Sequence, residues 1–272
     1  MKVFIVSDME GVSGIVKWQQ TDGMKEKRAY HEGRELYTEE INAAVRGAKA
    51  AGATEIVAVD CHGAGQDWTF NSFVPELIHP DCDWVSGHPW SRYTEMFETG
   101  CDVALMIGMH AKSGTPDGVL CHTISTTTWR NLYFNDTCVG EFGINAALCG
   151  HYGVPVAVIT GDDATVREGK DLVGESLTGV AVKRGLSRYS ARNIPPVRAR
   201  RMIEDGVKSA LTNRNWPKPY VPVKPCTIAV DLGTVDSANQ FKDRHGVEIP
   251  DPLKVVSRAK DWLTAWNQIW HW

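Results

Sequence analysis

An apolar run near the start of the chain, Val3-Phe4-Ile5-Val6, leads directly into Ser7-Asp8-Met9-Glu10-Gly11. Four successive apolar residues are typical of a strand that is buried on both faces of a parallel sheet. Two carboxylates at the end of such a strand are costly to bury unless a positive charge neutralises them. The pattern therefore predicts an α/β fold with a metal ion beside Asp8 and Glu10.

Two further apolar strands end in residues of the same kind. Residues 56–59 run into Asp60-Cys61-His62, and residues 103–108 run into Met109-His110. The carboxyl ends of parallel strands meet at one edge of an open α/β sheet, where such folds build their active sites. We therefore expect one shared site, made of Asp8, Glu10, His62 and His110.

The order of the elements predicts a mostly parallel central sheet flanked by helices. Apolar residues at helical spacing place a helix over 30–51, which joins the first two strands in a βαβ unit. The segment 119–135 is rich in β-branched and polar residues and predicts an antiparallel excursion. The alternation continues with a strand at 83–86, a strand at 103–108, a helix at 141–152 and a strand at 156–160.

The pattern weakens beyond residue 165 and predicts a smaller C-terminal α/β lobe over about 180–272. Strands are expected near 180–183 and 227–232, with a helix at 197–211 between them. We expect residues 1–272 to form a single catalytic domain, in which residues 1–165 are the lobe that holds the metal site. A last helix carries a stripe for which core packing is our first interpretation and subunit contact the second: Trp262, Leu263, Trp266, Ile269 and Trp270.

Charge and cysteine content argue against several classes of protein. The 29 basic and 33 acidic residues are interspersed and give a net charge of -4, so no nucleic-acid partner is expected. Seven cysteines without a Cys-x-x-Cys spacing argue against a disulfide framework and a thiolate zinc site, and indicate a reducing compartment. No stretch approaches the ~20 apolar residues of a membrane span, and no signal peptide opens the chain. We expect a cytoplasmic protein without a membrane partner.

The residue types at the predicted site favour a transition metal. Asp8 and Glu10 are two positions apart, so both carboxylates lie on one side of an extended chain and can face one metal or bridge two. Imidazoles shift the preference from magnesium or calcium toward zinc, manganese or iron, and zinc is our first expectation. Glu141 opens a helix, where the dipole favours a carboxylate, and can complete the site. His122 lies outside the strand ends and is a candidate acid, base or oxyanion stabiliser.

Each of these residues also has a plainer interpretation. Asp8 and Glu10 can be solvated at a strand end, a single histidine is more often hydrogen-bonded and structural, and Glu141 alone is an ordinary first-turn residue. The matched placement at three strand ends favours the metal site. The sequence does not decide whether Asp60 binds the metal directly or orients a histidine that does.

Taken together, the motifs resemble the D-aminopeptidases of peptidase family M55. The order and approximate spacing agree over residues 1–165, while the carboxyl-terminal part diverges. The motifs that carry the resemblance are Ser7-Asp8-Met9-Glu10-Gly11, Asp60-Cys61-His62, Gly108-Met109-His110-Ala111, Cys121-His122, residues 135–145, Thr160-Gly161-Asp162-Asp163, and Val182-Lys183 with Ser187-Arg188.

The resemblance implies a zinc-dependent aminopeptidase that removes N-terminal D-amino acids, such as D-alanine, from short peptides or amides. It implies hydrolysis by a hydroxide that bridges two zinc ions per chain, with His122 as the catalytic histidine. Members of the family are cytoplasmic homo-oligomers, and the type enzyme is a decamer, so a homo-oligomer is expected here. The implied ligands are Asp8 bridging both ions, Glu10 and His110 on one ion, and His62 and Glu141 on the other.

Two other functions remain open. A binuclear metal hydrolase of another amide or of a phosphoester would use the same residues, although the Gly-Asn-His-Glu signature of metallophosphoesterases is absent. A non-catalytic module that binds one magnesium ion is the second alternative, against which the two histidines argue. The preference for D over L substrates depends on loops that the sequence leaves unassigned, such as 18–27 and 66–72.

Overall fold

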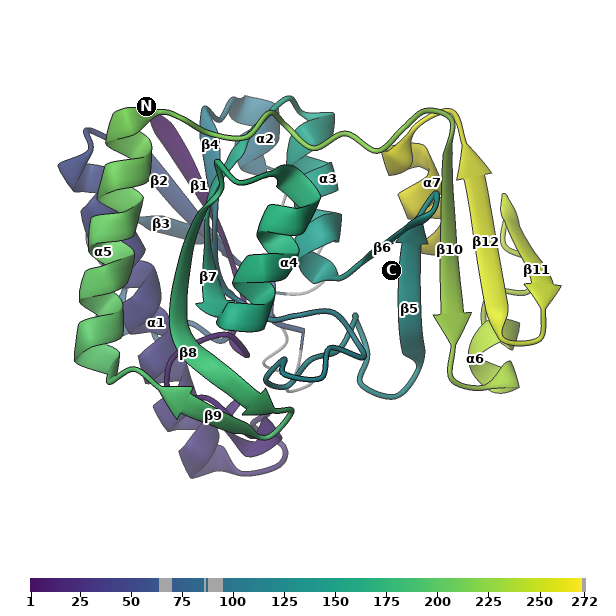
Figure 1. Cartoon of the computed structure of the whole chain (residues 1–272), viewed down its shortest axis with the longest axis horizontal. Coiled ribbons are helices and arrows are strands. Elements are labelled where there is room, and N and C mark those ends of the chain that lie inside the picture. The colour runs from purple at the N-terminus through teal and green to yellow at the C-terminus, as the bar shows by residue number, and fades with distance from the viewer. Residues whose placement is uncertain (64–69, 86, 88–94, 271–272) are drawn as a thin grey trace.

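The computed structural model describes residues 1–63, 70–85, 87 and 95–270 (Figure 1). Its larger sheet has seven strands in the order β3-β2-β1-β4-β7-β8-β9, parallel from β3 to β8 with β9 antiparallel. The expected mostly parallel central sheet is confirmed; Ser86, the last residue of one predicted strand, lies outside the described residues. The strands are β1 (Lys2–Ser7), β2 (Glu55–Asp60), β3 (Asp83–Val85), β4 (Val103–Met109), β7 (Val156–Asp162), β8 (Thr178–Ser187) and β9 (Ser190–Asn193).

Strand β1 lies between β2 and β4, and both of these neighbours are parallel to it. Ser7 at its carboxyl end is in register with Asp60 of β2 and with Ile107 of β4. The residues that follow these three strands therefore leave the sheet at the same edge. Asp8 follows β1 at this edge and contacts both His62, which follows β2, and His110, which follows β4.

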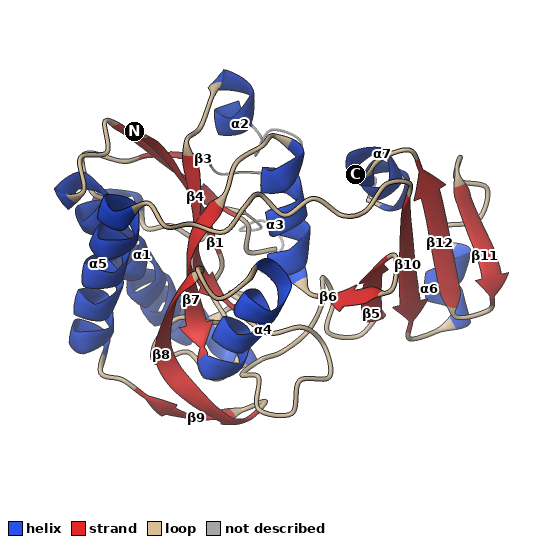
Figure 2. Cartoon of the chain, turned by 45° about the horizontal axis from the view of Figure 1, so that its top comes forward, coloured by secondary structure: helices blue, strands red, loops and turns tan. Residues whose placement is uncertain are grey.

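Helices cover both faces of the larger sheet (Figure 2). On one face lie α1 (Lys27–Ala50), which begins three residues before the predicted helix, and α5 (Pro196–Asn213). On the other face lie α3 (Glu141–His151) and α4 (Asp163–Val173). The short helices are η1 (Trp18–Gln20), η3 (Pro75–Leu77) and α2 (Glu95–Thr99).

Alternate side chains of β1 pack on opposite faces of the larger sheet. Val3 and Ile5 belong to the apolar cluster that includes Tyr37 of α1. Phe4 and Val6 belong to the cluster on the opposite face. Because the side-chain period of a strand is two, a fully apolar run is what a two-sided core requires.

A second sheet of five strands, in the order β11-β12-β10-β5-β6, is antiparallel throughout. The predicted antiparallel excursion begins later than expected, because only an isolated bridge joins Thr123 and Ser125 before β5. The positive φ angles of Leu120 (51°) and Ile124 (61°) interrupt an extended conformation there. The elements are β5 (Trp129–Phe134), β6 (Thr137–Val139), β10 (Cys226–Leu232), β11 (Val247–Asp251), β12 (Lys254–Ala259), α6 (Val235–Asn239) and α7 (Trp262–Ile269).

The division between the two sheets does not follow the lobes predicted from the sequence. Strand β8 and helix α5, expected in the C-terminal lobe, belong with the larger sheet, whereas β5 and β6 pair with strands from the end of the chain. Leu132 of β5 and Ile228 of β10 share one apolar cluster with Phe4 of β1. The two sheets are therefore joined by a common core.

The tryptophan stripe packs inside the protein, as its first interpretation predicts. Trp262, Trp266 and Ile269 of α7 are at most 4% exposed and belong to the same cluster. Trp262 and Trp266 stack at 5.8 Å, and Trp129 of β5 meets Trp266 edge-on at 6.4 Å. The helix therefore closes the core of the second sheet.

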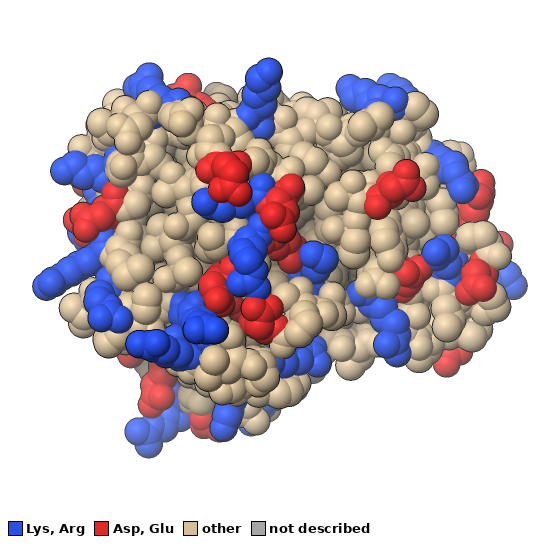
Figure 3. Space-filling view, in the orientation of Figure 1, with Lys and Arg blue, Asp and Glu red and all other residues tan. Residues whose placement is uncertain are grey.

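Lys and Arg side chains are mixed with Asp and Glu over the face drawn in Figure 3. This distribution matches the interspersed charges of the sequence. In the described part of the chain, no helix is long and apolar enough to cross a bilayer.

Candidate metal centre

The edge formed by β1, β2 and β4 brings the five predicted ligands together. His62 Nδ1 lies 3.2 Å from Asp8 Oδ1 and 3.1 Å from Glu10 Oε2. His110 Nε2 lies 3.4 Å from Asp8 Oδ2 and 3.3 Å from Glu141 Oε1. Asp8 is thus in contact with both histidines. Apart from Glu141, whose side chain is 14% exposed, each of these residues is at most 4% exposed.

Two glycines allow the strand ends to approach this closely. Gly11 N donates a hydrogen bond of 2.8 Å to the Gly108 carbonyl oxygen. A Cβ atom on Gly11 would overlap the carbonyl oxygen of Met109, and one on Gly108 would overlap that of Asp8. Gly108 also has a φ of 75°, which favours glycine. The turn after β1 therefore depends on residues without side chains.

Each of the three histidines has one ring nitrogen on a backbone carbonyl and the other directed at the carboxylates. A carbonyl oxygen only accepts, so the nitrogen beside it carries a proton, and the other nitrogen is the one that can bind a metal once its own proton is displaced. This arrangement orients an imidazole for metal binding. The carbonyl pairs are His62 Nε2 with Thr21 O at 2.7 Å, His110 Nδ1 with Ala111 O at 3.0 Å, and His122 Nδ1 with Leu120 O at 2.9 Å.

Two of the buried ligand atoms have no hydrogen-bond partner within the described residues, Glu10 Oε2 and His110 Nε2. Leaving a buried polar atom unpaired costs about 1–3 kcal/mol. Candidate ligand atoms of Asp8, Glu10 and His110 lie within 4.8 Å of one another, and so do those of His110, His122 and Glu141. Carboxylate oxygens and imidazole nitrogens are ligands of zinc. The residues present therefore fit a zinc site.

The ionisation of the cluster shows how strongly its acids attract a positive charge. Burial lowers the pKa of His62, but the charge of Glu10 and a hydrogen bond to Asp8 raise it well above its usual value. Burial also lowers the pKa of His110, and Glu141 raises it well above the usual value. Burial would raise the pKa of Asp8, yet the hydrogen bond with His62 holds it below its usual range. A bound cation would take the place of these protons.

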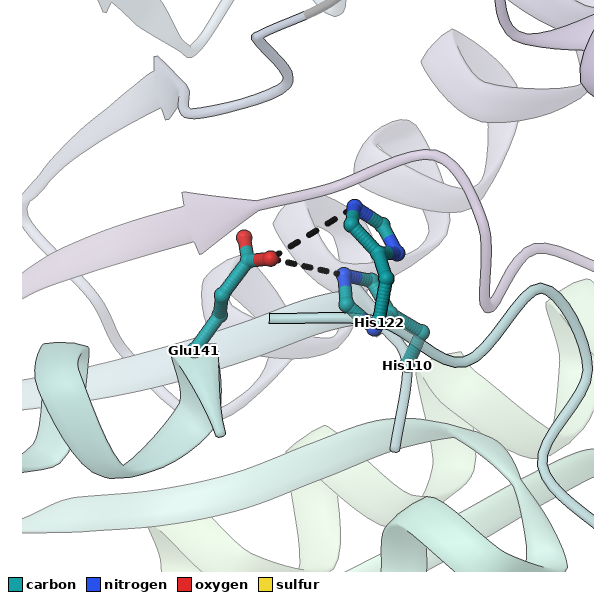
Figure 4. Close-up of side chains that lie close together, drawn as sticks. All are labelled: His110, His122 and Glu141. Carbon is teal, nitrogen blue, oxygen red and sulfur yellow. Dashed lines mark ion pairs between the residues drawn. The ribbon is translucent and has the colours of Figure 1, made fainter. Parts of the chain in front are cut away.

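His122 joins the cluster from a loop. Its ring stacks on His110 with centroids 4.1 Å apart, and its Nε2 lies 3.5 Å from Glu141 Oε1 (Figure 4). Trp18 meets the ring edge-on at 5.4 Å. Burial and the neighbouring charge of His110 lower the pKa of His122, so the imidazole is neutral at pH 7. A neutral imidazole is able to accept a proton.

Side chains from other elements fix this loop. Asp162, the N-cap of α4, accepts a hydrogen bond of 2.6 Å from Val119 N. Glu141 Oε1 accepts one of 2.7 Å from Ile124 N. The loop is therefore held on both sides of His122.

Asp60 does not lie among the ligand atoms. Its oxygens accept hydrogen bonds from Tyr37 Oη at 3.1 Å, from His62 N at 2.9 Å and from Ser72 N. Asp60 therefore orients the backbone that carries His62, which the sequence had left undecided.

A cavity of about 570 Å³ opens beside the cluster and is lined by both sheets. The loop expected to govern specificity, 18–27, contributes Trp18, Asp22 and Lys25; of the other such loop, residues 66–69 lie outside the described residues. The segment between α6 and β11 contributes Phe241 and Arg244, which no motif had singled out. This segment is far from the metal ligands in the sequence, so its place in the cavity becomes visible only in the folded structure.

The fold and the cluster define the class of this protein as an α/β metalloenzyme. The model of peptidase family M55, described as D-aminopeptidase, matches residues 1–271. The chain therefore belongs to the M55 family.

A sequence match and a solved structure agree with this membership. A D-aminopeptidase of Bacillus subtilis (strain 168) is 33% identical over 270 residues, which are 98% of this chain and 94% of the relative. A solved structure, the Zn-dependent D-aminopeptidase DppA from Bacillus subtilis, is described as a self-compartmentalizing protease. It matches with a TM-score of 0.89 and 31% identity, over 99% of this chain and 95% of that one.

Proposed function

We propose that this protein is a zinc-dependent aminopeptidase that hydrolyses N-terminal D-amino acids, such as D-alanine, from short peptides or amides. One observation carries the chemistry: three histidines, each oriented by a backbone carbonyl, direct their second ring nitrogen at three carboxylates. The zinc and the D-residue are supported by membership of the family and by the names of the two relatives.

The proposal places about two zinc ions in each chain. The contacts around Asp8 support it as the bridging residue, because its two oxygens face different histidines. The direct contacts pair Glu10 with His62, whereas the family resemblance groups Glu10 with His110. The second grouping is also supported, since ligand atoms of Asp8, Glu10 and His110 lie within 4.8 Å of one another.

When bound, zinc polarises a carbonyl and lowers the pKa of a water molecule toward ~7. The residues of the chain have separate tasks. Glu141 is held by the Ile124 amide and keeps His110 and His122 oriented. His122 Nε2 faces the cluster, where it can accept a proton from water and return it to the departing amine. The aromatic ring of Trp18 packs edge-on against this imidazole, and both side chains line the cavity.

The proposal extends to assembly and location. A homo-oligomer is supported by the self-compartmentalizing description of the solved relative, and a decamer is the size to test by analytical ultracentrifugation. We place residues 1–272 in a single catalytic domain, supported by the common core of the two sheets. A cytoplasmic location is supported by the seven cysteines, all of them free in the structure.

A panel of D- and L-aminoacyl amides, assayed with the zinc-loaded protein, tests the function. We expect hydrolysis of the D-alanyl amide together with about two bound zinc ions per chain. Glu10→Gln should lose zinc and activity, whereas Glu32→Gln, at an exposed position of α1, should keep both. Turnover of a phosphoester alone would favour the other metal hydrolase, and one magnesium ion without turnover would favour a binding module.

A further inference from the structure

The cavity has a second wall, supplied by the second sheet and its helices, that carries a positive charge. Gln240, Phe241 and Arg244 follow α6, and Ile269 and Trp270 lie at the end of α7. All of them line the cavity that also contains Asp8, Glu10 and His62. A ligand that fills the cavity therefore touches both the metal ligands and this wall.

Arg244 is held in one orientation. Its Nη1 donates a hydrogen bond of 2.9 Å to the Ile269 carbonyl oxygen, and its guanidinium carbon lies 4.6 Å from the centre of the Phe241 ring. An arginine has five N–H donors, so this contact leaves most of them for a ligand. A guanidinium fixed in this way loses little side-chain entropy when it binds a carboxylate.

The charge of Arg244 has no acidic partner in the described part of the chain. The ion pairs of the second sheet join Lys254 to Asp231 and Arg258 to Glu248 instead. The other cation of the cavity wall, Lys25, lies 3.4 Å from Asp22. Of the lysine and arginine residues that are described and line the cavity, Arg244 is thus the one whose charge no neighbouring described acid balances.

We propose that Arg244 binds the C-terminal carboxylate of a short peptide while the N-terminal residue is cleaved at the metal centre. The inference rests on the proposed aminopeptidase function and names its preferred substrates: di- and tripeptides with a free carboxylate. A planar guanidinium pairs with a carboxylate through two parallel hydrogen bonds. The cavity of about 570 Å³ is of the size that takes small ligands and not long chains.

The test compares D-alanyl-D-alanine with its C-terminal amide, since the two differ only in the carboxylate. The wild-type protein should have the higher kcat/KM for the free acid. Arg244→Gln should lower kcat/KM for the free acid about 10- to 100-fold, the range expected for a lost charged hydrogen bond, and leave the amide within about 3-fold. Arg258→Gln, an exposed position on β12, is the matched control and should change neither value.

The same pair of ligands is titrated calorimetrically into zinc-loaded proteins that also carry His122→Ala, so that binding is measured apart from turnover. Weaker binding of the free acid alone to Arg244→Gln supports the inference. Equal losses for acid and amide, or no preference in the wild type, overturn it. If the free acid binds through Arg244 but the wild-type protein cleaves neither compound, the carboxylate site stands and the proposed aminopeptidase function fails.

Discussion

The ammonium nitrogen of Lys183 lies 2.6 Å from the backbone carbonyl oxygen of Glu10. The same nitrogen donates to the carbonyl oxygens of Val12 at 2.8 Å and Ile15 at 2.7 Å, and the residue is 1% exposed. One side chain of β8 thus uses all three of its donors on the segment that follows β1. The position of a predicted metal ligand depends on a lysine from far along the chain.

Replacing Lys183 with methionine should leave these three carbonyl groups unpaired. We expect the free energy of unfolding to fall by about 3 kcal/mol, because each buried acceptor loses a charged donor. Zinc affinity should fall as well, since Glu10 is no longer fixed. Urea denaturation and metal analysis measure the two effects. Lys170→Met, on the surface of α4, should stay within about 0.5 kcal/mol of the wild type. Wild-type stability in the Lys183 variant would contradict the prediction.

Glu40 should make the stability of the protein depend on pH. Its Oε1 accepts a hydrogen bond of 2.9 Å from Ser13 N, while its Oε2 is buried without a partner among the described residues. Burial raises the pKa of this carboxyl to about 7 from an ordinary value of 4.5. The folded state therefore binds more protons than the unfolded state between these values. Stability falls as the pH rises from about 4.5 to 7, by about 3 kcal/mol in total.

Glu40→Gln isolates this effect because the amide resembles the protonated acid and keeps an acceptor for Ser13. Below pH 4.5 the variant and the wild type should unfold at similar urea concentrations. At pH 8 the variant should be the more stable by up to about 3 kcal/mol. Glu32→Gln, at an exposed position, should show no such divergence. A constant difference between wild type and Glu40→Gln at every pH would rule out the titration.

The sequence predicts those parts of the site that local patterns determine. Asp8, Glu10, His62 and His110 follow apolar strands, and parallel strands must deliver such residues to one edge. Glu141 was found from its place at a helix start. Each of these predictions uses only the residues that lie close to the site residue in the sequence.

The parts that were missed depend on contacts between distant segments. Strand β5 pairs with β10 across almost a hundred residues, so nothing local indicates that Arg244 reaches the cavity. The first part of the predicted antiparallel excursion, residues 119–128, is a loop in which Leu120 and Ile124 adopt positive φ angles and Glu141 holds the Ile124 amide. Lys183 stands out in the sequence as a charged residue at the end of a predicted apolar strand. The backbone carbonyl groups that it contacts, however, depend on the order of the strands in the sheet.

Gly108 and Gly153 form a matched pair that separates backbone strain from crowding. Their φ angles are 75° and 74°, but a Cβ atom on Gly108 would overlap the Asp8 carbonyl oxygen, whereas one on Gly153 meets nothing within 4 Å. Gly153→Ala should cost only about 1 kcal/mol of strain. Gly108→Ala should cost more than about 3 kcal/mol and lower zinc content, because β1 and β4 must separate. Equal losses in thermal unfolding would show that the close approach is unimportant.

His122→Ala tests whether this residue acts in catalysis or holds metal. As a catalytic residue, His122 can be removed with the zinc content unchanged, while kcat falls about 10²- to 10⁴-fold. His31→Ala, at an exposed position of α1, is the control and should keep both zinc and activity. The structure also gives a reason for the opposite result, since ligand atoms of His122, His110 and Glu141 lie within 4.8 Å of one another. Loss of about one zinc ion per chain would make His122 a ligand, and unchanged turnover would remove it from the mechanism.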